Sequence, residues 1–260
     1  MDVRLRRVVV IKLGGSVLVD KESYREAARF LVRRLHRCSS ERFVVVVSAE
    51  KGLTDELERL ASGITENPNP RSLDLLWSTG EMRSVALLTL HLENFGVPVA
   101  GLNAHETGLR CSRPSPQTRI QSLSSQLRRA LDQHVIVVVP GFFGTSTNGT
   151  IVSLGRGGSD LSAVLLAYEL EALRCELVKD VPGYFTEDPD ISPGAERLSS
   201  ISYDVAIEMA QRGCELIQPV ALAAARERSL QLVVRSLNDE VSGTVVSTEA
   251  NEERTCVAES

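Results

Sequence analysis

The sequence predicts an α/β protein, a three-layer αβα sandwich with a mostly parallel central sheet. Short β-branched runs alternate with segments of helical periodicity, which is typical of βαβ units with helices on both faces of a sheet. The chain has 260 residues, 43% of them hydrophobic, and no linker, repeat or low-complexity stretch divides it. It can therefore bury a full core, as one large domain or as two closely joined lobes.

The expected elements follow from these runs in chain order. Strands are predicted at Val8–Lys12, Phe43–Ser48, Val97–Leu102, Val135–Pro140, Leu177–Lys179 and Leu230–Val234. Helices are predicted near Lys21–Cys38, Thr54–Ser62, Leu73–Phe95, Ser122–Gln133, Leu161–Leu173, Tyr203–Arg212 and Val220–Arg228, with Gly96 and Gly213 as C-terminal stops. Asn67–Pro70 and Arg113–Thr118 are expected to be surface loops, and the stretch after Val246 a polar tail.

The composition excludes several classes of function. A net charge of −5 and the lack of a basic patch with interleaved aromatic residues argue against binding to nucleic acid. The apolar runs are too short to span a membrane, and the N-terminus has no apolar signal region, so we expect a cytoplasmic protein with no membrane partner. The five cysteines form no C-x-x-C pair, and the four histidines do not cluster with them, so we expect neither disulfides nor a zinc site.

The most informative segment is Ile151–Asp160, which runs directly into a predicted helix. The free N–H groups and the positive dipole end of a helix opened by small residues favour an anion. Arg156 and Asp160 add a cation and a carboxylate, which together point to phosphoryl transfer on an acidic substrate. A glycine-rich turn capped by Ser159 or Asp160 would explain the glycines alone, but it does not explain the arginine.

Two further glycine turns follow predicted strands. The first strand ends in Lys12-Leu13-Gly14-Gly15-Ser16, where the glycines allow the backbone to approach a phosphate and Lys12 can reach its oxygens. The second ends in the turn Ser48–Thr54, and ligands of open α/β sheets bind beyond these strand ends. Neither turn fits the Walker A or G-x-G-x-x-G spacing, so each could also be purely structural. Lysine is rare here, since only Lys12, Lys21, Lys51 and Lys179 occur among 29 basic residues.

Taken together, these segments resemble the amino acid kinase superfamily and, within it, the catalytic domain of aspartokinases. The most specific match is Leu154-Gly155-Arg156-Gly157-Gly158-Ser159-Asp160. The other matches are Lys12 through Ser16, Ser48 through Thr54, Ser78 through Glu81, Gly141 through Gly144, and Lys179 through Pro189. The resemblance covers about residues 7 to 246.

The resemblance implies an ATP-dependent kinase that phosphorylates the β-carboxylate of L-aspartate with the help of Mg²⁺. It assigns catalytic roles to Lys12 and Asp160. It assigns aspartate binding to Ser48, Thr54, Glu81, Phe142, Arg156 and Ser159. It assigns nucleotide binding to Gly14, Gly15, Ser16, Gly157, Gly158, Lys179, Asp180 and Phe185. It implies no metal ligand from the protein, and the acceptor carboxylate needs no general base because it is ionised near pH 7.

The nucleotide side departs from the family pattern. Asp190 and Glu215 stand where most aspartokinases have an arginine and a lysine, and Phe185 holds the place of a tyrosine. Lys179 stands where the family usually has threonine. Two interpretations of Lys179 stay open, since it could supply the charge that Glu215 cannot, or it could be a solvated residue at a strand end.

The resemblance also predicts the organisation of the chain. We expect a catalytic domain over residues 1–250, with an acceptor-binding lobe of about 1–150, a nucleotide-binding lobe of about 151–250, and a polar tail at 251–260. No regulatory ACT-type domain is expected, because the sequence stops soon after Val246, and analogy predicts a homodimer. Two alternative functions stay open, namely a kinase for another amino-acid carboxylate and a non-catalytic member that binds a ligand or a partner subunit.

Overall fold

The structure, a computed structural model of the chain, describes residues 7–111, 119–120, 124–155, 157–238 and 242–248. Its main sheet contains β1 (Arg7–Leu13), β2 (Glu41–Val47), β3 (Val99–Gly101), β6 (Ile136–Pro140), β9 (Cys175–Val178), β10 (Ser200–Ser202), β11 (Leu232–Arg235) and β12 (Thr244–Ser247). The strand order is β10-β12-β11-β9-β1-β2-β6-β3, and every neighbouring pair is parallel except β11 with β12. One sheet thus runs through both halves of the sequence.

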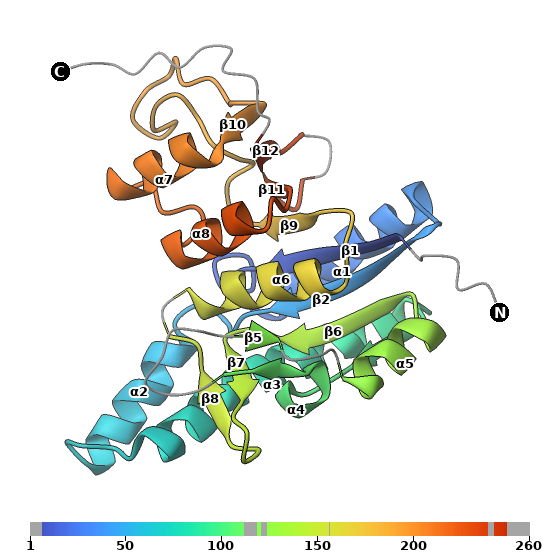
Figure 1. Cartoon of the computed structure of the whole chain (residues 1–260), viewed down its shortest axis with the longest axis vertical. Helices are drawn as coiled ribbons and strands as arrows, with labels where there is room; N and C mark the ends of the chain where they lie inside the picture. The colour runs from blue at the N-terminus through green and yellow to red at the C-terminus, as the bar shows by residue number, and fades with distance from the viewer. Residues whose placement is uncertain (1–6, 112–118, 121–123, 156, 239–241, 249–260) are drawn as a thin grey trace.

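Helices cover both faces of this sheet, as Figure 1 shows with α6 in front of the central strands and α1 behind them. The helices are α1 (Lys21–Arg37), α2 (Leu53–Ile64), α3 (Pro70–Asn94), α4 (Ala104–Thr107), α5 (Ser125–Gln133), α6 (Gly158–Glu169), α7 (Tyr203–Gln211) and α8 (Pro219–Glu227). Because successive strand residues point to opposite faces, Val9 and Ile11 of β1 pack with α1 and α3, whereas Val8 and Val10 pack with α5, α6 and α8. The predicted three-layer α/β sandwich is confirmed.

Several helix ends follow directly from the local sequence. Asp20 caps α1 by accepting the Ser23 N–H at 2.8 Å, and Ser23 bonds back to the Asp20 N–H. The α3 helix begins at Pro70 and not at the expected Leu73, since Asn69 accepts the Arg71 N–H and proline suits the first helical position. Gly96 and Gly213 follow α3 and α7 with positive φ angles, so both predicted stops are confirmed.

A second, smaller sheet was not predicted from the sequence. It contains β4 (Leu109–Arg110), β5 (Arg119–Ile120), β7 (Phe143–Thr145) and β8 (Ile151–Ser153) in the order β5-β4-β7-β8. Strands of two or three residues are too short to show periodicity, which also explains why β10 was not predicted. The helix α4 and the strand β12 have four residues each and are also too short. The β7–β8 hairpin leads directly into the loop before α6. The predicted loop Arg113–Thr118 lies outside the described residues. Of the predicted polar tail, only Ser247 and Thr248 are described.

A buried group of charges joins the two halves of the sheet. Glu176 of β9 accepts two hydrogen bonds from Arg34 of α1, at 2.7 and 2.8 Å, and one each from Arg174 and Arg235. Arg174 also makes two bonds of 3.1 Å to Glu41 of β2. Since Glu176 is almost fully buried, its charge depends on these arginines.

Replacing Glu176 with alanine is expected to lower the free energy of unfolding by about 3–5 kcal/mol, because Arg34 and Arg235 would keep their charges in a buried site after losing this counterion. Urea denaturation measures this loss. Glu208→Ala is the matched control, since Glu208 and Arg212 form an exposed pair on α7 and its loss should change stability by no more than about 0.5 kcal/mol. Equal effects of the two substitutions would contradict the structural role of Glu176.

Candidate active site

The carboxyl ends of the neighbouring strands β9, β1, β2 and β6 are joined by backbone hydrogen bonds. The Gly14 N–H donates to the Val178 carbonyl, the Ser48 N–H to the Leu13 carbonyl, and the Gly141 N–H to the Val47 carbonyl. Gly15 lies so close to the next turn that a Cβ there would be 3.0 Å from the Ala49 carbonyl oxygen. The glycine turn after β1 is therefore required for the close approach of the β1 and β2 loops.

The start of α6 packs directly against the turn after β6. A Cβ on Gly158 would lie 2.8 Å from both Leu154 Cβ and Phe142 Cδ2, and one on Gly141 would lie 2.8 Å from Ser159 Cβ. Gly157 precedes the helix with φ +77°, and no side chain caps it. The first turn of α6, which is the positive end of the helix dipole, thus lies against the strand ends. This arrangement favours the binding of an anion there.

Phe142 has an unusual backbone conformation at the centre of this arrangement. Its φ is +67°, a region that costs a bulky residue on the order of 1–3 kcal/mol. The ring lies edge-on to Phe143 at 4.7 Å and tilted against Trp77 at 6.2 Å. Trp77 therefore packs against a site residue.

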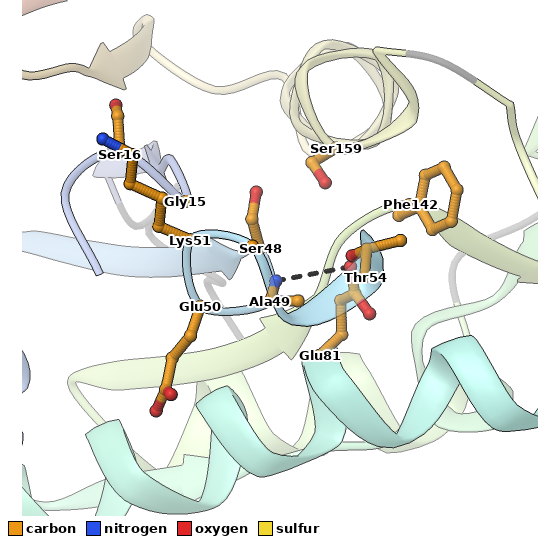
Figure 2. Close-up of a pocket in the computed structure, with 11 residues that line it drawn as sticks. Gly15, Ser16, Ser48, Ala49, Glu50, Lys51, Thr54, Glu81, Phe142 and Ser159 are labelled. Atoms are coloured by element: carbon orange, nitrogen blue, oxygen red, sulfur yellow. Dashed lines mark hydrogen bonds between the residues drawn. The ribbon is translucent and has the colours of Figure 1, made fainter. Parts of the chain in front are cut away.

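Two adjoining pockets open above the strand ends. The first has a volume of about 330 Å³ and is lined by Gly15, Ser16, Ser48, Ala49, Glu50, Lys51, Gly52, Thr54, Glu81, Phe142 and Ser159. The second has a volume of about 210 Å³ and is lined by Lys12, Ser48, Phe142, Gly157, Gly158, Ser159, Asp160, Lys179 and Gln218. Ser48, Phe142 and Ser159 line both, so the two pockets meet between α6 and the β2 turn. Figure 2 shows the residues that line the first pocket.

The second pocket contains two lysines on one carboxylate. Asp160 is 2% exposed and accepts a 2.8 Å hydrogen bond from Lys12 Nζ through Oδ1. Lys179 Nζ lies 3.1 Å from Oδ2 and 3.4 Å from Oδ1, and the Gln218 N–H donates to Oδ2 at 3.4 Å. Burial alone would raise the pKa of Asp160, but the charges of Lys12 and Lys179 outweigh it and bring the pKa to about 2. Lys179 is therefore an ion-paired residue and not a solvated one.

The first pocket contains a buried carboxyl group that pairs with no cation among the described residues. Glu81 is 3% exposed, and its Oε1 accepts the Ala49 N–H at 3.3 Å, the bond drawn in Figure 2. Its Oε2 has no hydrogen-bond partner among the described residues. Burial raises its pKa to about 7, although the Ala49 N–H opposes this rise. Glu50, by contrast, turns away from the pocket in Figure 2 and pairs with Arg83 at 3.4 Å.

The other residues expected on the acceptor side fall at the first pocket, with one exception. Ser48 and Thr54 line it from the β2 turn and the first turn of α2, and Ser159 faces them from α6 (Figure 2). Arg156 lies outside the described residues, so the structure does not place it.

The residues expected on the nucleotide side are less concentrated. Gly157, Gly158 and Lys179 line the second pocket, whereas Gly15 and Ser16 line the first. The Ser16 hydroxyl donates to Asp180 at 3.3 Å. Phe185 lines neither pocket but pairs with Arg197 in an isolated bridge. Tyr184 beside it is fully buried in the core.

Gln218 is a site residue that the sequence did not reveal. It precedes α8, its N–H reaches Asp160, and its side-chain amide donates to Glu215 at 3.4 Å. In the sequence, Pro219 marks the start of the helix. Only the fold brings the neighbouring Gln218 to the carboxylate of Asp160, 58 residues away. Two helix starts, those of α6 and α8, therefore meet at the second pocket.

The donor set does not form a protein-held metal site. No group of three histidine, cysteine, aspartate or glutamate side chains that could hold an ion occurs within the described part of the chain. All the polar groups that contact Asp160 here are themselves hydrogen-bond donors. Among the described residues, no helix is both long and apolar enough to cross a membrane.

Comparison with known proteins decides the family. The family model described as "Amino acid kinase family" matches residues 7–236, which is most of the sequence. The chain belongs to the amino acid kinase family. The resemblance expected from the sequence is thus confirmed.

Several proteins similar to this chain carry aspartokinase names. It is 39% identical to an aspartokinase of Thermus thermophilus over 246 residues, which cover 94% of this chain and 60% of that one. Its fold matches the aspartate kinase from Synechocystis with a TM-score of 0.80 and 37% identity, over 92% of this chain and 40% of that one. It matches E. coli aspartokinase III in complex with aspartate and ADP with a TM-score of 0.76 and 26% identity, over 93% of this chain and 64% of that one. The chain spans about three fifths of the length of the Thermus relative.

The raised pKa of Glu81 has a consequence for stability. An acid whose pKa is raised by folding, here from 4.5 to about 7, favours the folded state when protonated, so its contribution is lost as the pH rises through this window. Glu81→Gln removes the titration. The free energy of unfolding of the variant, relative to the native chain, should therefore increase between pH 5 and pH 8, by an amount on the order of 2–3 kcal/mol.

Urea denaturation of both proteins at several pH values measures this difference. The substitution by glutamine can also change the free energy of unfolding by an amount that does not depend on pH, and such a change does not affect the trend with pH. A difference that does not change with pH would show that Glu81 titrates at its ordinary pKa.

Proposed function

We propose that the chain catalyses the ATP-dependent phosphorylation of the β-carboxylate of L-aspartate, giving 4-phospho-L-aspartate and ADP. One observation carries the proposal: the joined pockets have an uncompensated carboxyl group, Glu81, at one end and the two lysines of Asp160 at the other. A small acceptor with an ammonium group and a distant anionic group fits this polarity. The aspartokinase names of the relatives, and the aspartate and ADP in the E. coli complex, support it.

The acceptor would lie in the first pocket. Glu81 would accept hydrogen bonds from its ammonium group, which supplies the partner that Oε2 lacks. Ser48, Thr54 and Ser159 offer hydroxyl groups around it, and Phe142 forms an apolar wall. The resemblance adds Arg156 as a bidentate partner for one carboxylate. This set favours a free α-amino acid over an N-acylated one, which has no ammonium group.

The reaction would take place where the pockets meet. A β-carboxylate oxygen attacks the γ-phosphorus of ATP, the bond to the bridging oxygen breaks, and ADP leaves with that oxygen. The nucleophile is already ionised, so no base is needed, and the barrier is the approach of two anions. Lys12 would neutralise the transferred phosphoryl group, while the amides of the Gly14–Gly15 turn and of the α6 start would bind its oxygens. Asp160 would hold Lys12 in place.

The nucleotide would occupy the half of the molecule that follows residue 151, and residues 1–150 would hold the acceptor. Gly157, Gly158 and Lys179 line the pocket on the nucleotide side of this assignment. Asp180 and Phe185 line neither pocket, so their assignment to the nucleotide rests on the family resemblance alone. Mg²⁺ would enter with the phosphates of ATP, because the described residues hold no ready set of ligands for it.

We also propose a homodimer. The expectation comes from family analogy, and one surface supports it: the outer side of α3, where Leu90 is 60% exposed, lies beside the short edge strand β3 and lines a groove of about 500 Å³ with Gly101 and Leu102. Light scattering on the purified chain should give the mass of two copies, and a monomer at micromolar concentration would refute this assembly.

The proposed activity predicts formation of ADP and an acyl phosphate when the chain is mixed with Mg-ATP and L-aspartate. The acyl phosphate can be trapped by hydroxylamine as a hydroxamate. Lys12→Ala should lower turnover at least about 100-fold, since it removes the cation closest to Asp160 at the phosphoryl site. Lys21→Ala, at the exposed start of α1, is the matched control and should keep native turnover.

The outcomes separate the alternatives. Turnover with another amino acid but not with aspartate would favour a sibling kinase. Failure to bind Mg-ATP in calorimetry would favour a non-catalytic member, for which the carboxylates of Asp190 and Glu215 would be the first explanation. Native turnover in Lys12→Ala would refute the role of Lys12.

Acceptor binding should depend on pH through Glu81. With a pKa of about 7, Glu81 loses its negative charge as the pH falls through neutrality, while the groups of free aspartate do not titrate between pH 6 and 8. The value of kcat/KM for aspartate should therefore fall about tenfold from pH 8 to pH 6. In Glu81→Gln it should be low and nearly independent of pH, and a native pH profile in that variant would exclude Glu81 as the titrating group.

A further inference from the structure

We propose that Lys179 is a second phosphate-binding lysine, which forms an ion pair with Asp160 and turns to a phosphate of the nucleotide when the nucleotide binds. Asp160 is then a positioning residue for both lysines and not a metal ligand. The inference rests on the proposed function, because it assigns the phosphates of that reaction to particular groups.

The two lysines are held unequally. Lys12 Nζ makes a short bond of 2.8 Å to one oxygen of Asp160, and its side chain is 7% exposed. Lys179 Nζ is shared between both oxygens at 3.1 and 3.4 Å, and its side chain is 13% exposed. The bonds of Lys179 to Asp160 are longer, and its side chain is more exposed. Lys179 can therefore move away from Asp160 with a smaller loss of hydrogen-bond energy than Lys12.

The charge balance also leaves one cation to spare. Asp160 carries one negative charge, and two ammonium groups and a backbone N–H point at it. Burial and the charge of Lys12 lower the pKa of Lys179 although the charges of Asp160 and Asp180 oppose this, which shows that the two carboxylates do not fully compensate its charged form. An additional anion in this pocket would supply that compensation. The charges of the pocket residues therefore favour an anionic ligand.

The geometry around Lys179 fits a phosphate group. Lys179 and Lys12 line the same pocket of about 210 Å³, and the uncapped start of α6 at Gly157 and Gly158 also lines it. Gln218 brings the start of α8 to the same pocket. A phosphate that enters would meet two lysines and the start of α6, which together provide charge and N–H donors, whereas the Gln218 N–H already donates to Asp160.

The same contacts argue against a metal ion on Asp160. Both of its oxygens accept hydrogen bonds from ammonium groups, and a divalent cation would have to displace at least one lysine from a buried site. Two ammonium groups close to the carboxylate also repel a cation.

Binding of ADP and of adenosine to Lys179→Met tests the assignment. The dissociation constant for ADP should rise at least tenfold, whereas that for adenosine and that for aspartate should stay within about twofold of the native values. A purely structural role for Lys179 would weaken all three ligands together. Lys179→Arg should recover part of the ADP affinity, and Lys21→Met is the control for the loss of a lysine. Trp77, the only tryptophan, packs on Phe142 at the pocket and serves as the fluorescence probe.

Native ADP affinity in Lys179→Met would overturn the inference while leaving the proposed kinase activity intact, if that variant still phosphorylates aspartate. If the native chain itself binds no ADP, the proposed function and this inference both fail. A second variant keeps the test independent of Lys179→Met: Asp160→Asn should lower kcat at least tenfold, yet bind ADP in the presence of a chelator at least as tightly as the native chain. Loss of chelator-resistant ADP binding in Asp160→Asn would contradict the positioning role.

Discussion

Burial of the Asp160 carboxylate is the constraint on which the site depends. A charge with 2% exposure in a core of apolar strands is stable only if nearby groups compensate for it. The compensation comes from Lys12 at the end of β1, from Lys179 just after β9, and from the Gln218 N–H at the start of α8. Because Asp160 itself lies in the first turn of α6, these interactions join two neighbouring strands and two helix starts at one point. The two lysines that stabilise the buried carboxylate also place positive charge where a phosphoryl group would be transferred.

The opposite end of the joined pockets shows the reverse situation. Glu81 is nearly as buried as Asp160, but no cation faces it among the described residues, and its pKa rises to about 7 instead of falling. Such a group lowers the stability of the folded chain at neutral pH, and a ligand with an ammonium group would recover that cost on binding. Two carboxyl groups of similar burial thus have opposite pKa shifts, and the difference lies only in their neighbours. This contrast gives the pockets the polarity that an amino-acid acceptor and a polyphosphate require together.

Close backbone packing keeps these groups at working distance. Gly15, Gly141 and Gly158 each stand where a Cβ would meet a neighbouring loop or helix at 3.0 Å or less. Phe142 adopts a strained backbone angle between them, and its ring lines both pockets. Strain of this kind persists only where surrounding packing determines the conformation, which here is supplied by Phe143, Trp77 and the start of α6. The glycines that first suggested a phosphate loop thus also serve to bring four chain segments together.

The sequence by itself determined the fold class, the central strands, the helices on both faces and the family, because long periodic segments and the Leu154–Asp160 motif are local signals. It also named Lys12, Glu81, Phe142 and Asp160 as site candidates, and the structure places them at the two pockets. The second sheet was missed, since strands of two or three residues have no readable period. Whether Lys179 was solvated or engaged, and that Gln218 reaches Asp160, were decided only by the tertiary structure. The physical reason is that ion pairing and burial depend on distances between residues far apart in the chain, and no local pattern contains those distances.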